Sequence, residues 1–142
     1  MPVSNTEKAT ALAQVPLFSG ITTESMMRLA DVAGEQEFAA GSFIVRQGQV
    51  GSGLYVILAG SVRVLRGSDE LARLGQNEFF GELSVIDQQP RLASVQAETD
   101  VRCLGLASWD LLALLERDPQ LALNMIRGLV ARLRSSGEHH HH

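Results

Sequence analysis

Histidine and lysine are nearly absent from this sequence. The four histidines all stand in the run His139–His142, which is typical of an expression tag, so we treat residues 138–142 as a tag and residues 1–137 as one domain. Without native histidine there is no Ser-His triad, His-ligated zinc site or imidazole acid or base. Lys8, the only lysine, lies near a polar terminus, where a phosphate-loop or Schiff-base lysine is not expected. We therefore expect no enzyme, no metal and no cofactor.

Cysteine and long apolar runs are equally scarce. Cys103 is the only cysteine, so an internal disulfide is impossible, and its apolar neighbours predict a buried core thiol. The longest apolar run, Leu54–Ala59, is far shorter than a membrane span. Residues 1–10 contain no apolar stretch of the signal-peptide type. We expect a cytoplasmic protein that does not by itself bind a membrane.

An excess of positive charge is also lacking. Twelve basic and sixteen acidic residues give a net charge of −4, and the basic residues are scattered. We therefore do not expect this chain alone to bind nucleic acid. What the sequence does have is a 45% hydrophobic fraction in 142 residues, which is enough for the core of one compact domain.

The middle of the chain has the pattern of a β-structure. Residues 35–107 consist of short β-favouring runs separated by glycines, which predicts a small antiparallel barrel or roll. In this region the alternation places Val62 and Val64 on one face and Arg63 on the other, with a turn at Gly67. The predicted fold class is α+β: a jelly-roll-like antiparallel β-roll with a short helix after Gly81, flanked by N-terminal and C-terminal helices.

Helical patterns stand on both sides of this region. A short helix is indicated before Pro16, and a second is predicted over about 23–33, capped by Thr22 or Thr23 and ended by Gly34. After Ser108, a candidate cap, two consecutive helices follow, the second beginning at Pro119.

The last helix carries an apolar stripe. Its members are Leu121, Met125, Leu129 and Leu133, with Ile126 and Val130 beside them. This stripe is compatible with packing on the chain's own roll, with pairing to a second copy as a homodimer, and with covering a ligand.

The segment Phe79–Val95 brings an acid and an arginine together after a glycine. A helical turn following Gly81 would present unpaired backbone N–H groups, which suit a phosphate that a glycine allows to approach closely. Arg91 follows Pro90, and its guanidinium matches two phosphate oxygens, whereas an ionised Glu82 suits a ribose hydroxyl. Taken alone, Glu82 and Arg91 are also compatible with a structural salt bridge.

Over about residues 15–136 the sequence resembles the cyclic nucleotide-binding domain shared by the bacterial catabolite activator family and the regulatory subunits of cyclic-AMP-dependent protein kinase. Two motifs carry the resemblance. One is in the roll and comprises Gly48, Tyr55–Ile57 and Gly60–Val64. The other is the phosphate-binding cassette, Phe80–Val95, which matches the kinase-type pattern without gaps.

The resemblance implies roles for individual residues. Glu82 would hold the ribose 2′-hydroxyl and Arg91 would pair with the cyclic phosphate. The full set implied to contact phosphate and ribose is Gly81, Glu82, Leu83, Ser84, Arg91, Leu92, Ala93 and Ser94. The base pocket would use Val64 and Leu71 as walls. Its lid would come from the last helix, where Arg132, Arg134 and Ser136 are the candidates, and we favour Arg132 and Ser136.

Two positions depart from the commonest family pattern. Ser84 stands where alanine is frequent, and Leu92 stands where a small or hydroxyl residue usually follows the arginine. In cyclic-GMP-selective relatives the latter position tends to be threonine, whose hydroxyl reaches the guanine. Leu92 therefore favours cyclic AMP.

The resemblance implies a sensor that binds cyclic AMP as its ligand and transmits occupancy through the C-terminal helix to an output domain outside this sequence. The alternative is a structural roll that dimerises without nucleotide. A cupin-like carboxylate enzyme is disfavoured, because such barrels work through histidine-ligated metal and no native histidine is present.

Overall fold

The computed structural model describes residues 4–50, 53–81 and 89–140, with residues 136–140 described through their backbone alone. In chain order the elements are α1 (Asn5–Ala13), the 3-10 helix η1 (Pro16–Phe18), α2 (Thr23–Val32), β1 (Gly34–Phe38), β2 (Phe43–Val45), β3 (Gly53–Ala59), β4 (Val62–Arg66), β5 (Asp69–Leu74), β6 (Phe79–Phe80), β7 (Ser94–Ala97), β8 (Val101–Ala107), α4 (Ser108–Arg117) and α5 (Pro119–His140).

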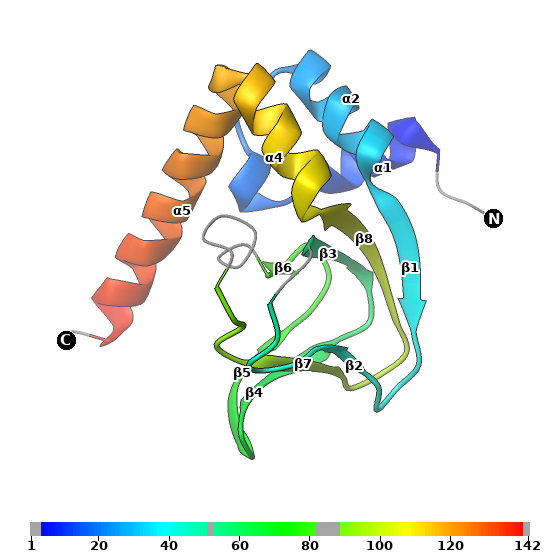
Figure 1. Cartoon of the computed structure of the whole chain (residues 1–142), viewed down its shortest axis with the longest axis vertical. Helices are drawn as coiled ribbons and strands as arrows, with labels where there is room; N and C mark the ends of the chain where they lie inside the picture. The colour runs from blue at the N-terminus through cyan, green and yellow to red at the C-terminus, as the bar shows by residue number, and fades with distance from the viewer. Residues whose placement is uncertain (1–3, 51–52, 82–88, 141–142) are drawn as a thin grey trace.

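The strands form two four-stranded antiparallel sheets within the described part of the chain. Their strand orders are β1-β8-β3-β6 and β2-β7-β4-β5. The sheets face each other as a roll, and α1, α2 and α4 cover one end of it, while α5 leaves this helical end and runs along one side of the roll (Figure 1). The predicted α+β fold, a β-roll with helices at both ends of the chain, is confirmed, and the short helix predicted after Gly81 lies outside the described residues.

The β4–β5 hairpin shows why the alternating segment forms a strand with one buried face. Val62 is fully buried and Val64 is half-buried against the same interior cluster, as predicted, and Gly67 makes the turn with a φ of 62°. The strand register shifts between Val64 and Leu65, and Leu65 is also buried. A bulge of this kind bends a strand, which suits the curvature of a small roll.

Two separate apolar clusters make up the core. The larger lies between the helices and the β3–β8 pair, and includes Leu17, Phe18 and Leu29. The smaller fills the roll and includes Ile57 and Cys103. The prediction of a core thiol is confirmed, because Cys103 has no exposed surface and burial raises its pKa to about 12.

The helix boundaries agree with the sequence pattern except at two residues. Thr22 caps α2, since its hydroxyl accepts a hydrogen bond from the Ser25 amide at 3.1 Å. The prediction that Gly34 ends this helix is wrong. Gly34 begins β1, because the backbone is already extended at Ala33. Ser108 is the first residue of α4 and not its cap, a position that Ala107 occupies with no side-chain hydrogen bond.

Helix α5 begins at Pro119, as predicted, and is anchored at that end by Asp118. The Asp118 carboxylate accepts hydrogen bonds from the Leu121 amide, at 3.1 Å, and from the Ser25 hydroxyl. It also forms an ion pair with Arg28 at 3.1 Å. The Ser25 hydrogen bond is the main cause of the lowered pKa of this carboxyl. The start of α5 is thereby tied to α2.

The apolar residues of α5 are divided between two faces. Leu121 and Met125 are buried in the helical cluster and Leu129 packs against it. The opposite face exposes Leu123, Ile126, Val130 and Leu133, the last with 73% of its surface accessible. Of the stripe predicted from the sequence, the first part packs on the chain's own fold, whereas Ile126, Val130 and Leu133 stay exposed. No helix in the described residues combines the length and apolar character needed to cross a membrane.

Replacing the α5 cap tests this anchor. Asp118→Ala removes the acceptor for the Leu121 amide and should lower the free energy of unfolding by about 1 kcal/mol. Asp118→Asn keeps a capping oxygen and should cost less. Because the folded-state pKa of Asp118 is lowered, the contribution of its charge is present at neutral pH and is lost as the pH falls through that pKa. Urea unfolding at several pH values measures both effects, and an Ala variant as stable as the parent at neutral pH would contradict the anchor.

Candidate functional site

The most unusual polar residue in the roll is a buried arginine. Arg91 has only 7% of its surface exposed, and its Nη2 donates a hydrogen bond to the carbonyl oxygen of Gly53 at 2.8 Å. A guanidinium withdrawn from water needs fixed partners, because burying a charge is expensive without them. The start of β3 supplies one of those partners through its backbone.

Gly81 is placed directly against this guanidinium. Its φ is +95°, a conformation that side chains disfavour, and a Cβ there would lie 2.5 Å from Arg91 Nη1 and 2.7 Å from the Gly53 carbonyl oxygen. Only glycine therefore fits on both counts. Three segments that are far apart in sequence meet at this point, and we call Gly53, Gly81 and Arg91 the cradle.

The backbone around Arg91 is held by the loop that precedes β3. The Arg91 amide donates to the Gln49 carbonyl at 2.7 Å, and the Gly48 amide donates to the Arg91 carbonyl at 2.9 Å. Val50 and Pro90 form an isolated β-bridge beside them. These bonds fix the base of the arginine side chain and explain why Gly48, with a φ of +86°, belongs to the roll motif.

An aromatic pair lies behind the cradle. Tyr55 of β3 stacks on Phe80 of β6 with ring centroids 5.2 Å apart, and the two residues are partners in the strand register. Burial raises the pKa of the Tyr55 hydroxyl, and the nearby positive charge of Arg91 partly offsets this rise. The pair positions Phe80, and hence the chain that enters Gly81.

Of the remaining residues predicted to contact phosphate and ribose, three are described in the structure and three lie outside the described residues. Leu92 is 65% exposed, and Ala93 is half-buried. The Ser94 hydroxyl accepts a hydrogen bond from the Gln47 amide at 2.8 Å, which ties β7 to the same loop. Glu82, Leu83 and Ser84 lie outside the described residues.

The predicted base-pocket residues are spread over the roll and α5. Val64 packs in the interior of the roll, whereas Leu71 is 50% exposed. The Arg132 guanidinium lies over the Phe79 ring, 4.6 Å from its centroid. Ser136 is in α5, and its side chain is outside the described residues.

Sequence reasoning did not identify the backbone groups that complete the cradle. The Gly53 and Gln49 carbonyls and the Gly48 amide act through atoms that every residue possesses, so the sequence carries little signal for them. The one available signal was the glycine pair Gly51 and Gly53, which the sequence pattern alone does not distinguish from the other glycines that separate the β-favouring runs. In the structure a Cβ at Gly53 would lie 2.8 Å from the Leu106 carbonyl oxygen, so glycine is required there for close packing.

The chemistry of the cradle suits an anion. A buried arginine offers a planar set of N–H donors, and the adjacent glycine leaves its approach free of a side chain. Within the described part of the chain, no cluster of acidic, cysteine or histidine side chains could hold a metal ion. A β-roll with such a cradle belongs to a class of folds that bind small anionic ligands.

Comparison with known proteins defines that class further. A family model described as the cyclic nucleotide-binding domain matches residues 35–118. The chain therefore belongs to the cyclic nucleotide-binding domain family, and the family resemblance inferred from the cassette is confirmed.

The chain is similar to curated proteins of more than one kind and to solved structures. It is 37% identical to the cyclic AMP receptor protein of Thermus thermophilus over 85% of this chain and 58% of that protein. It is 30% identical to the cAMP-dependent protein kinase regulatory subunit of Hypocrea atroviridis over 89% of this chain and 26% of that protein. A crystal structure of the N-terminal domain of a transcriptional regulator from Streptomyces coelicolor is similar, with a TM-score of 0.78 and 33% identity, and the match covers 90% of this chain and 93% of that one. The chain thus spans only part of both curated relatives.

The crowding at Gly81 generates a test with a matched control. Gly81→Ala combines a strained φ with a contact to the Gly53 backbone, whereas Gly41→Ala has a similar φ of +89° and open space around its Cβ. We expect Gly41→Ala to cost about 1 kcal/mol of unfolding free energy, and Gly81→Ala about 1 to 3 kcal/mol more. Urea denaturation measures both, and equal losses would show that the cradle is not tightly closed around Gly81.

Proposed function

We propose that this chain is a cyclic AMP-preferring sensor domain that performs no chemistry on its ligand. The observation that carries the proposal is the buried Arg91, held by the Gly53 carbonyl directly beside Gly81. A guanidinium in this position pairs with the cyclic phosphate through two parallel hydrogen bonds. The match to the family and the similarity to a protein named a cyclic AMP receptor support the choice of ligand.

In this proposal the rest of the nucleotide contacts residues around the cradle. Glu82 accepts from the ribose 2′-hydroxyl, and the backbone near Leu83 and Ser84 contributes N–H groups to the phosphate. The exposed Leu92 provides no hydroxyl for a guanine, which favours adenine. Val64 and Leu71 line the base, and Arg132 and Ser136 cover it from α5.

Transmission of occupancy follows a chain of contacts from the cradle to α5. Gly81 follows Phe80, which stacks on Tyr55, and the neighbouring Phe79 carries the Arg132 guanidinium on its ring. A ligand that moves the segment entering Gly81 thereby acts on the second half of α5. Such a ligand shifts the helix only if it binds the two helix positions with different affinity. The output domain that α5 would control lies outside this sequence.

Calorimetric titration with cyclic AMP and cyclic GMP tests the sensor, after any co-purified nucleotide has been removed. We expect saturable binding that is tighter for cyclic AMP. Arg91→Ala should weaken it by about 2 to 5 kcal/mol, which is the usual effect of removing one member of a buried, hydrogen-bonded charge pair. Arg102→Ala is the matched control, because Arg102 forms its ion pair with Glu35 elsewhere on the roll.

Arg91→Lys is a more conservative variant, which distinguishes the loss of a phosphate partner from a failure of Arg91→Ala to fold. It keeps the charge but not the planar pair of donors, so it should bind cyclic AMP with an affinity between those of the parent and Arg91→Ala. Circular dichroism of each variant verifies the fold. No binding of either nucleotide by the folded parent would refute the sensor and leave the alternative, a roll that dimerises without nucleotide.

We further propose that the exposed face of α5 forms a homodimer with a second copy of this chain. Leu123, Ile126, Val130 and Leu133 are 40%, 56%, 44% and 73% exposed. Their spacing of three, four and three residues is that of the a and d positions of a coiled coil. The packed face of α5 uses other residues, so the helix can serve both contacts at once.

Charging this face should separate the copies. We expect the parent to sediment as a dimer in analytical ultracentrifugation. Ile126→Glu should raise the dissociation constant of this dimer by at least about tenfold. Met27→Glu on α2 is the control, since Met27 is 39% exposed and lies on another helix. A parent that stays monomeric at high concentration would contradict the dimer.

A further inference from the structure

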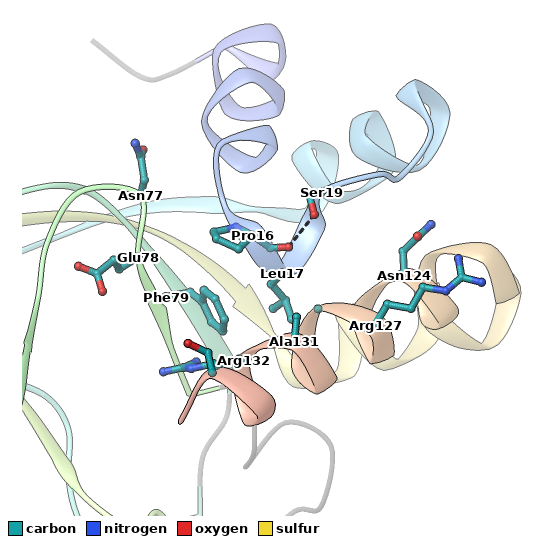
Figure 2. Close-up of a pocket in the computed structure, with 12 residues that line it drawn as sticks. Pro16, Leu17, Ser19, Asn77, Glu78, Phe79, Asn124, Arg127, Ala131 and Arg132 are labelled. Atoms are coloured by element: carbon teal, nitrogen blue, oxygen red, sulfur yellow. Dashed lines mark hydrogen bonds between the residues drawn. The ribbon is translucent and has the colours of Figure 1, made fainter. Parts of the chain in front are cut away.

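A cavity of about 800 Å³ lies between α5 and the start of β6, apart from the cradle. Pro16 and Leu17 of η1 form one wall, Phe79 forms a second, and Ala131 of α5 forms a third (Figure 2). Neither Arg91 nor Gly81 lines it. Its volume is within the range of small-molecule sites in proteins.

Gly128 determines how closely the two sides of this cavity approach. A Cβ at Gly128 would lie 3.0 Å from Leu17 Cα and 3.1 Å from the Leu17 carbonyl oxygen. These are backbone atoms, which cannot move aside as a flexible side chain would. Glycine in the interior of a helix is otherwise unfavourable, so its presence in α5 is explained by this contact with η1. The same contact sets the distance between α5 and η1 at this side of the cavity.

The lining of the cavity is apolar in its middle and basic at both ends. Figure 2 shows Arg132 at one end, beside Phe79, and Arg127 at the other end, beside Asn124. Glu78 is the one acidic residue of the lining, and its carboxylate accepts a hydrogen bond from the Gly75 amide at 3.0 Å. The formal charge of the lining is therefore positive.

Two polar side chains at the Arg127 end of the cavity have donor and acceptor groups without a protein partner among the described residues. Asn124 is 91% buried, given its exposure of 9%, and its amide makes no hydrogen bond with any residue that the structure describes. Arg127 likewise makes no ion pair within the described ranges. An amide that has no protein partner but reaches a cavity is free to hydrogen-bond water or a ligand there. Because Asn124 lines the cavity, its amide is available to a ligand there.

We propose that this cavity is a second ligand site, which binds a small amphipathic anion. The apolar body of the ligand packs between Leu17, Phe79 and Ala131, and its anionic group accepts hydrogen bonds from Asn124 and Arg127. Charge complementarity selects the anion, and the apolar middle of the cavity selects an aromatic or aliphatic body over a sugar. Arg132 is the one lining residue that we also placed over the base of the nucleotide. The anionic group of the second ligand lies at the opposite, Arg127 end of the cavity, so the two ligands do not compete for it.

A matched pair of fluorescent probes tests this site. 8-Anilinonaphthalene-1-sulfonate carries a sulfonate on an aromatic body, and N-phenyl-1-naphthylamine is the same body without the charge. We expect the sulfonate to bind saturably, with one dye per chain. The neutral probe should bind at least about fivefold more weakly. Decanoate should displace the sulfonate dye, and cyclic AMP should not.

Three substitutions locate the dye. Ala131→Trp fills the cavity and should weaken binding by at least about tenfold, because it removes the space for the aromatic body. Arg127→Gln should weaken binding of the sulfonate by about fivefold and leave the neutral probe unaffected. Arg117→Gln is the control, since it makes the same change of charge at the end of α4, outside the lining.

Other results would overturn the proposal. Absence of saturable dye binding, or equal affinity for the two probes, would remove the case for an anion site. Unchanged affinity in both Ala131→Trp and Arg127→Gln would place the dye elsewhere, and Ile126→Glu would then show whether it binds the exposed face of α5. Displacement by cyclic AMP that is lost in Arg91→Ala would place the dye in the cradle.

Discussion

The withdrawal of one guanidinium from water determines how this roll is built. Arg91 is buried with its charge, so the surrounding chain must supply polar atoms at fixed positions, and the Gly53 carbonyl does so at 2.8 Å. That carbonyl faces the guanidinium only because Gly53 has no side chain between β3 and the backbone of β8. Gly81 approaches the same group from β6 under the same restriction. The glycines of this region are therefore part of the site, as well as of the turns.

The helical layer performs a different task from that of the roll. It has its own apolar cluster, and it holds the beginning of α5 through Asp118 and the middle of the helix through the contact of Gly128 with Leu17. Beyond Gly128 the Arg132 guanidinium of α5 lies over the Phe79 ring of the roll. In the proposed sensor, the first half of α5 is the support and the second half is the part that responds to the ligand. The exposed apolar residues of α5 span both halves.

Much of this fold was predictable from local patterns. Alternation in β4, the glycine turns and the caps depend on short-range geometry, and so the roll, the position of α2 and the start of α5 at Pro119 were confirmed. The exposure of Leu133 was not predictable, because a broad apolar stripe on a helix does not reveal which of its residues find partners. Ser108 and Gly34 were misplaced because residues at the junction of a strand and a helix carry both kinds of signal. The meeting of Gly53 with Arg91, and the cavity bounded by Gly128 and Leu17, depend on tertiary contacts through backbone atoms. The phosphate role that we propose for Gly81 and Arg91 rests on the resemblance of the cassette, and the structure brings these two residues together.

The central claim is that the Arg91 guanidinium is the group that receives the phosphate of the ligand. Nuclear magnetic resonance of the arginine side-chain N–H groups, assigned with Arg91→Lys and followed during titration with cyclic AMP, tests this claim most directly. The account predicts that the Arg91 resonances and the Gly81 amide shift together and saturate at one nucleotide per chain. Binding that leaves both signals unchanged would contradict it, because the ligand would then occupy a site other than the cradle.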